Sequence, residues 1–157
     1  MKLDAKNVSV SIAGTTIVRN LSIEVPDLKF SALLGANGSG KTTLLRSIYR
    51  TQKMDSGIVR LDDKDITHFS DKKLARNMAV MGQFNQINFD YTVLDIALMG
   101  RYPFHSLLEQ ERERDYEIAL DALDKVGMKS YRDRNFQSLS GGEKQRVVLA
   151  RALTQSP

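Results

Sequence analysis

The chain has 157 residues, of which 41% are hydrophobic and 27% charged, close to the composition of an average globular domain. This balance excludes disordered and fibrous classes, and the absence of cysteine excludes disulfides, iron–sulfur clusters and thiolate chemistry. The net charge of +4 permits phosphate or nucleic-acid partners without indicating either, because lysine and arginine are spread along the chain. The sequence has no apolar run of about 18 residues and no apolar N-terminal core, so we expect a cytoplasmic protein.

The first part of the chain has the pattern of strands followed by one helix. Residues 8–25 alternate and are rich in β-branched side chains, which predicts two strands joined at Ala13-Gly14. Residues 29–35 form a short apolar run without clean alternation, which predicts a strand buried on both faces. The apolar residues of 41–50 recur at helical spacing, so we expect a helix with one buried face.

Residues 57–63 predict a further strand that ends in an acidic turn. Asp62, Asp63 and Asp65 could suggest a metal cluster, but their spacing fits no calcium loop. A polar surface turn is therefore the favoured interpretation.

The later part of the chain is predominantly helical. Residues 71–76 predict a short helix, and 77–83 a buried strand. From 92 to 154 the pattern is mostly helical, with Thr92 as the first N-cap and Gly127 as a helix stop. We interpret this helical half as an insertion into an α/β domain.

The segment GANGSGKT, from Gly35 to Thr42, matches the pattern G-x-x-x-x-G-K-[ST] in full, between a predicted strand and a predicted helix. Glycines let successive backbone N–H groups turn toward an anion, and the helix N-terminus adds the positive end of its dipole. Lys41 can reach the β- and γ-phosphate oxygens, and the Thr42 hydroxyl can coordinate Mg²⁺. A glycine-rich turn without a ligand is the weaker interpretation, so we expect a nucleoside triphosphate site.

The segment SLSGGEKQR, residues 138–146, combines a capping box with two glycines. Ser140 and Glu143 can start a helix without any ligand, but a capping box does not require Gly141 and Gly142, which weaken a helix. What these glycines provide is bare backbone N–H groups at a helix N-terminus, a second anion site. Ser140 lies 99 residues after Lys41 (140 minus 41).

Together, GANGSGKTT and LSGGEKQR resemble the Walker A loop and the signature motif of the ATP-binding cassette (ABC) ATPases. The resemblance covers essentially the whole chain. It implies an α/β P-loop NTPase fold, with a RecA-like parallel core, an N-terminal antiparallel β part and an inserted helical subdomain, incomplete at the C-terminus. The expected parts of this partial nucleotide-binding domain (1–157) are the core at about 1–84, the helical subdomain at about 85–140, and the signature with its helix at 139–157.

The resemblance implies ATP and Mg²⁺ as cofactors. The implied nucleotide-binding residues are Gly35, Ala36, Asn37, Gly38, Ser39, Gly40, Lys41, Thr42 and Thr43. Gln83 falls at the family's Q-loop, with Gln86 as a second candidate. Lys41 and Gln83 would then act in hydrolysis, and Thr42 and Gln83 at the metal. The family usually stacks an aromatic side chain on adenine, whereas this chain has Ile12 at the matching position.

The resemblance also implies partners. In the family two cassettes pair head to tail, so the signature acts on ATP held by the other copy. The implied signature residues are Leu139, Ser140, Gly141, Gly142, Glu143 and Gln145. Transmembrane permease subunits and a substrate-binding protein would complete an importer, with this subunit peripheral on the cytoplasmic face of the membrane. No nucleic acid is expected.

The segment ALMGRYPFHSLLE, residues 97–109, resembles cassettes of iron-siderophore, haem and cobalamin importers. An exposed helix end broken by Pro103 is the plainer interpretation. We expect His68 and His105 to be solvated rather than catalytic.

In the family, an apolar strand ending in Asp-Glu and a later histidine follow the segment that ends at Pro157. Asp124 and Asp133 do not replace those carboxylates, because neither follows an apolar strand. We therefore expect a fragment of a longer ATPase that is inactive by itself. Two alternatives stay open: a non-transport ABC ATPase of the translation or repair type, and a non-hydrolysing nucleotide-binding module.

Overall fold

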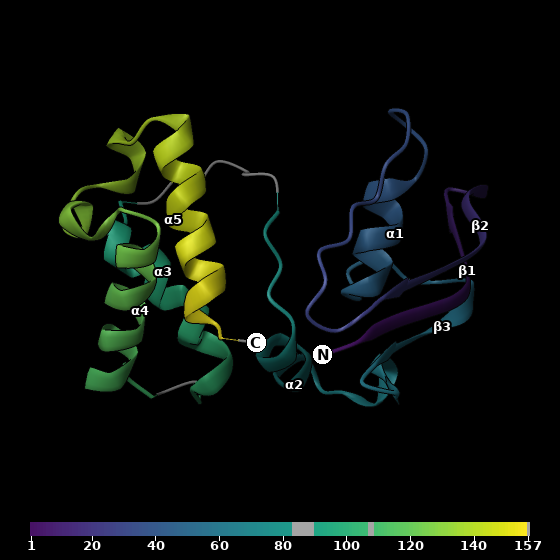
Figure 1. Ribbon diagram of the computed structural model, residues 1–157, viewed down its shortest axis with the longest axis horizontal. Helices are drawn as coiled ribbons and strands as arrows, with labels where there is room; N and C mark the ends of the chain where they lie inside the picture. Colours follow the sequence, from purple (N-terminus) through teal and green to yellow (C-terminus); the bar gives the residue numbers. More distant parts are fainter. Residues whose placement is uncertain (83–89, 107–108, 157) are drawn as a thin grey trace. The chain divides into compact units, whose positions relative to one another are not determined.

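The computed structural model describes residues 1–82, 90–106 and 109–156. The chain divides into two compact units, Met1–Ser70 and Asp71–Pro157, and each unit is described by itself (Figure 1).

The first unit is built on a four-stranded antiparallel sheet in the order β2-β1-β3-β4. Its strands are β1 (Leu3–Ile12), β2 (Thr15–Val25), β3 (Ser56–Leu61) and β4 (Lys64–Asp65). The predicted hairpin at Ala13-Gly14 is confirmed, and both turn residues have positive φ, 49° and 79°, as a tight two-residue hairpin requires. Asp62 and Asp63 lie between β3 and β4, which confirms the predicted polar turn.

One helix, α1 (Lys41–Ile48), packs against β1 and β2 and carries the phosphate-loop sequence at its N-terminus (Figure 1). Leu44 and Ile48 are buried, as helical spacing predicts, and so are Val8 and Val10 of β1. A short 3₁₀ turn, η1 (Ile66–His68), ends the unit, and His68 is exposed as expected.

The predicted strands over 29–35 and 77–83 are not found in the described residues. Residues 29–35 and 78–82 belong to no strand, and Asn77 ends helix α2. A strand is stabilised by ladder hydrogen bonds to its neighbours, and no described strand lies alongside either segment. Their apolar side chains are exposed as a result: Phe30 is 97% and Leu34 88% exposed.

The second unit is helical, as its sequence predicts. Its α-helices are α2 (Asp71–Asn77), α3 (Val93–Leu98), α4 (Glu113–Lys125) and α5 (Gly141–Thr154). Its 3₁₀ segments are η2 (Met99–Phe104), η3 (Lys129–Tyr131) and η4 (Phe136–Ser138). The predicted cap of α3 is confirmed, because Thr92 and Asp95 form a complete capping box. Gly127, with φ of 69°, follows α4.

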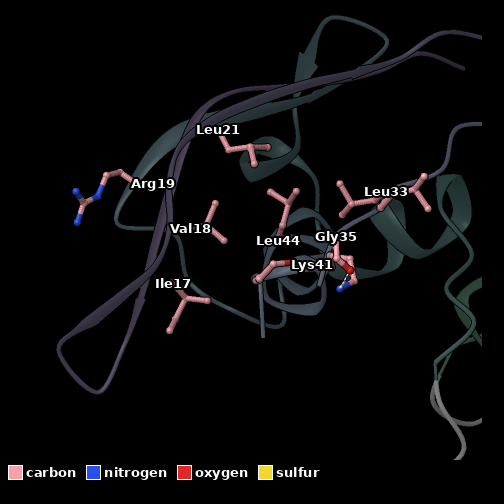
Figure 2. A pocket seen from close by; sticks show the side chains of 11 residues that line it. Ile17, Val18, Arg19, Leu21, Leu33, Gly35, Lys41 and Leu44 are labelled. Carbon is pink, nitrogen blue, oxygen red and sulfur yellow. Dashed lines mark hydrogen bonds between the residues drawn. The ribbon is translucent and has the colours of Figure 1, made fainter. Parts of the chain in front are cut away.

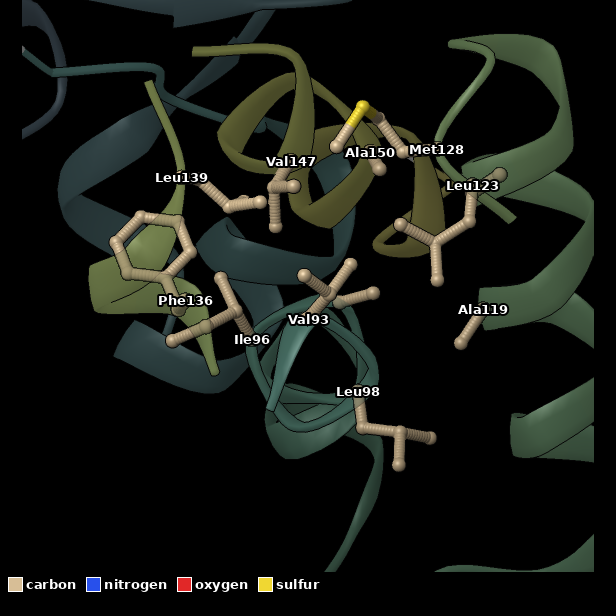
Figure 3. Close-up of a cluster of buried hydrophobic side chains, with 12 residues drawn as sticks. Val93, Ile96, Leu98, Ala119, Leu123, Met128, Phe136, Leu139, Val147 and Ala150 are labelled. Carbon is tan, nitrogen blue, oxygen red and sulfur yellow. The ribbon is translucent and has the colours of Figure 1, made fainter. Parts of the chain in front are cut away.

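Helices α3, α4 and α5 share one apolar core (Figure 3). Figure 3 shows Val93 and Ile96 of α3, Leu123 of α4 and Val147 of α5 gathered around a common centre. Phe136 and Leu139, which precede α5, close the core beside them. The start of α5 is therefore held in place by buried side chains.

His105 differs from the expectation of a solvated side chain. It is only 9% exposed, and its Nε2 lies 3.0 Å from Asp115 Oδ2. The sequence gives no sign of this burial, because the partner carboxylate comes from α4, ten residues further along the chain (115 minus 105).

Candidate functional site

The loop of residues 35–40 has the backbone that its glycines permit. Gly38 and Gly40 have φ of 79° and 87°, in the left-handed region that other residues enter at a cost. Gly40 is also confined, since a Cβ there would lie 3.0 Å from the carbonyl oxygen of Ile17 on β2. The loop therefore needs glycine at residue 40 for both conformation and space.

Lys41 folds back over this loop. Its Nζ donates to the carbonyl oxygens of Gly35, at 2.8 Å, and Ala36, at 2.7 Å. The ammonium group thus lies against the loop that is predicted to bind phosphate. The oxygens of a phosphate would compete with these two carbonyls, because the ammonium group would then gain the attraction of an opposite charge in addition to the hydrogen bond.

The N-terminus of α1 has no side-chain cap. Gly40 is its N-cap and offers no oxygen to the amides of the first turn. The first four N–H groups of a helix have no partner within it, so they present partial positive charge at the loop. Thr42, in this first turn, is exposed, and Lys41 is partly exposed. These donors are the ones that a phosphate group requires.

A pocket of about 330 Å³ lies beside the loop (Figure 2). Gly35, Ser39 and Lys41 form its polar side, and the rest is largely aliphatic. Figure 2 shows Ile17 and Val18 extending from β2, while Arg19 points away from Lys41. The sequence does not identify the pocket residues of β2, which include Ile17, because their place beside the loop depends on how β2 lies against Gly40.

Ile12, which the sequence analysis placed at the usual aromatic position, ends β1 and is 44% exposed. It does not line the pocket, whereas Ile17 does. Ile17, rather than Ile12, therefore supplies aliphatic surface in the pocket beside the loop.

The signature turn is a complete capping box at the start of α5. Ser140 Oγ accepts from the Glu143 amide at 3.4 Å, and Glu143 Oε2 accepts from the Ser140 amide at 2.8 Å. The Ser140 hydroxyl also donates to Glu143 Oε2 at 2.7 Å. These bonds from Ser140 lower the pKa of Glu143, so its carboxylate is ionised at neutral pH.

Gly141 and Gly142 are not required by the fold of this unit. A Cβ on either would meet no atom within 4 Å, and neither has a positive φ. Both residues are exposed. The space beside Gly141 and Gly142 is therefore open, and a phosphate group could approach the N-terminus of α5 there.

The other predicted signature residues have different surroundings. Leu139 is 6% exposed and belongs to the core that anchors the turn. Gln145 is exposed on α5. The Walker A loop and the signature lie in different units, Met1–Ser70 and Asp71–Pro157.

Gln83 and Gln86, the Q-loop candidates, lie outside the described residues. Within residues 1–82, 90–106 and 109–156, no group of three histidine or acidic side chains could hold a metal ion. The same ranges contain no helix that is both long and apolar enough to span a membrane.

Comparison with known proteins decides the family. The family model described as "ABC transporter" matches residues 18–157, which include the phosphate loop and the signature turn. The chain belongs to the ABC transporter family. Its cassette is 37% identical over 153 residues to the petrobactin import ATP-binding protein FpuD of Bacillus anthracis, covering 98% of this chain and 56% of FpuD.

The cassette is also 34% identical over 154 residues to the ferric enterobactin transport ATP-binding protein FepC of Escherichia coli, covering 98% of this chain and 57% of FepC. Among solved structures, a nucleotide-free ATP-binding cassette from an ABC transporter matches with a TM-score of 0.87 and 28% identity, covering 100% of this chain and 66% of that one. The fold is therefore that of the P-loop ABC cassettes, and the chain spans somewhat more than half the length of these curated relatives.

Proposed function

We propose that this cassette belongs to the ATP-binding subunit of an importer that couples binding and hydrolysis of ATP to uptake. The observation that carries the proposal is the uncapped N-terminus of α1, placed beneath the left-handed glycines of the loop and beside Lys41. This combination offers backbone donors, a helix dipole and one ammonium group to a single anion.

The triphosphate would lie along the loop from Gly35 to Thr43. Lys41 would exchange its two carbonyl partners for phosphate oxygens, and the Thr42 hydroxyl would hold Mg²⁺, with Gln83 as a second ligand. The metal would offset the charge of the phosphates. The aliphatic wall that includes Ile17 would receive the base without aromatic stacking.

The signature turn would act on a nucleotide held by a second copy. The space above Gly141 and Gly142, which no atom of the unit occupies, supports this role. Their amides and the Ser140 hydroxyl would donate to the γ-phosphate. Each ATP would then bridge two subunits, so that binding closes the pair and hydrolysis opens it.

The importer class and partners are supported by the relatives. FpuD and FepC carry petrobactin import and ferric enterobactin transport in their names. We propose a cargo of the iron-siderophore, haem or cobalamin kind, permease subunits and a substrate-binding protein as partners, and a peripheral location on the cytoplasmic face of the membrane.

Hydrolysis is assigned to the complete protein. Asp124 and Asp133 are exposed, and they pair with Lys129 and Arg132.

Titration calorimetry with Mg-ATP tests the nucleotide site. Lys41→Ala should weaken binding by about tenfold or more, because a charge-assisted contact to phosphate is lost. Lys6→Ala, which removes an exposed lysine that pairs with Asp4, is the matched control and should bind as the unchanged protein does. Equal affinity in all three proteins would contradict the proposal.

A further inference from the structure

Segment η2 (Met99–Phe104), which contains the sequence GRYP, contacts both α4 and α5. The Arg101 side chain is 12% exposed and lies at their junction. Its Nε donates to Asp115 Oδ1 at 2.8 Å, and its Nη1 donates to the carbonyl oxygen of Thr154 at 3.2 Å. One side chain thus joins the start of α4 to the end of α5.

The bond to Thr154 satisfies a particular need. Thr154 is the last residue of α5, and the last four carbonyls of a helix have no partner within it. A cation at this end also interacts favourably with the helix dipole. Arg101 therefore caps the C-terminus of α5 from a different element.

Asp115 holds the arginine in place. Burial raises the pKa of this carboxyl, but hydrogen bonds from Arg101 and the Arg112 amide, with the charges of His105 and Arg101, lower it overall. The carboxylate is therefore ionised at neutral pH. Its Oδ2 accepts from the Arg112 amide at 2.9 Å, so both oxygens are engaged. A buried ion pair satisfied in this way is costly to break from one side.

Gly100 allows the close approach. A Cβ on Gly100 would lie 2.3 Å from the carbonyl oxygen of Arg151 and 3.0 Å from the Thr154 Cβ. Only glycine lets η2 lie directly against the α5 backbone here. Gly100, Arg101 and Asp115 together form what we call the clasp.

We propose that Arg101 is a positioning residue for the signature turn: the clasp fixes the direction of α5 and so sets where the amides of Gly141 and Gly142 point. This inference rests on the proposed function. A helix of 14 residues is about 21 Å long, so a tilt of about 5° at the clasp would move its other end by about 2 Å. Misplacement by about 1 Å can cost about a hundredfold in rate.

The test measures steady-state ATPase activity and thermal unfolding of the complete protein assembled with its permease. Arg101→Met should lower kcat by about tenfold or more and leave the KM for ATP within about twofold, since the phosphate loop is untouched. Arg101→Lys keeps a cation that can reach one acceptor, so it should recover part of the lost kcat.

Thr92→Ala is the matched control, because it removes the N-cap hydrogen bond of α3 in the same unit and leaves the clasp and the core around the start of α5 unchanged. At an equal loss of thermal stability, this control should keep its kcat. The inference would be overturned by an Arg101→Met kcat within about twofold of the unchanged protein, or by an equal kcat loss in the control. Absence of ATP binding and turnover in the unchanged protein would instead refute the proposed function.

Discussion

Gly40 lies so close to Ile17 that a Cβ on the glycine would be 3.0 Å from the isoleucine carbonyl oxygen. The contact joins the phosphate loop to β2, which also supplies part of the pocket wall. The shape of the loop therefore depends on the sheet as well as on the loop's own glycines.

This contact predicts a difference between two glycine substitutions. Gly14→Ala, at φ of 79° in open space, should cost about 1–2 kcal/mol for the left-handed backbone alone. Gly40→Ala has the same kind of backbone cost plus the clash, so it should destabilise the chain more and weaken Mg-ATP binding as well. Urea unfolding and calorimetry check both effects. If Gly40→Ala and Gly14→Ala were equally destabilised and both kept the affinity for Mg-ATP, the assignment of Gly40 to the nucleotide site would be contradicted.

Gly142 offers a test that separates stability from function. Because a Cβ there meets no atom within 4 Å, Gly142→Ala should stabilise α5 by up to about 1 kcal/mol. Its ATPase activity in the complete protein should nevertheless fall several-fold, because the methyl group occupies the space proposed for the phosphate. Thermal unfolding and steady-state turnover are the measurements. A variant that is both more stable and fully active would show that the glycine has no role toward a ligand.

Two substitutions of Ser140 separate its role as the N-cap of α5 from its proposed role in binding phosphate. Ser140→Ala should lose about 1 kcal/mol of stability, because Oγ no longer accepts from the Glu143 amide. Ser140→Asp keeps an N-cap oxygen, but its carboxylate cannot donate to Glu143 Oε2 and repels that carboxylate, so it should also lose stability. Its negative charge should still abolish turnover by repelling the γ-phosphate. Full activity in Ser140→Asp would mean that this residue is a cap only.

Asp115 predicts an acid-dependent loss of stability. Its pKa in the folded chain lies below the unfolded value of about 3.9, so the ion pair contributes fully above that pH. The contribution is lost as the pH falls from about 4 through the folded pKa. The difference in unfolding free energy between the unchanged protein and Asp115→Asn should therefore shrink as the pH falls below about 4. A difference that grows in acid would contradict this sign.

The features that the sequence predicts correctly are local ones. Thr92, Ser140 and Glu143 form their caps through bonds that span three residues, so their spacing alone indicates them. The hairpin at Ala13-Gly14 follows from its turn residues in the same way.

The features that the sequence does not predict depend on distant neighbours. The strand expected over 29–35 needs a partner strand, and none of the described strands lies beside it. Burial of His105, the place of Ile17 beside the loop and the bond from Arg101 to Thr154 each require elements brought together by the fold. Periodicity carries no information about such contacts.

The central claim is that the signature of one copy completes the nucleotide site of another, and mixing two inactive variants tests it most directly. Lys41→Ala lacks a working phosphate loop, and Ser140→Asp lacks a working signature. If the signature acts between copies, mixing the two variants in equal amounts should make about a quarter of all nucleotide sites intact. About half of the dimers would then contain one copy of each variant, and each such dimer would have one intact site out of two. ATPase activity of the complete protein should then reappear on mixing. A mixture as inactive as its two components would contradict the account.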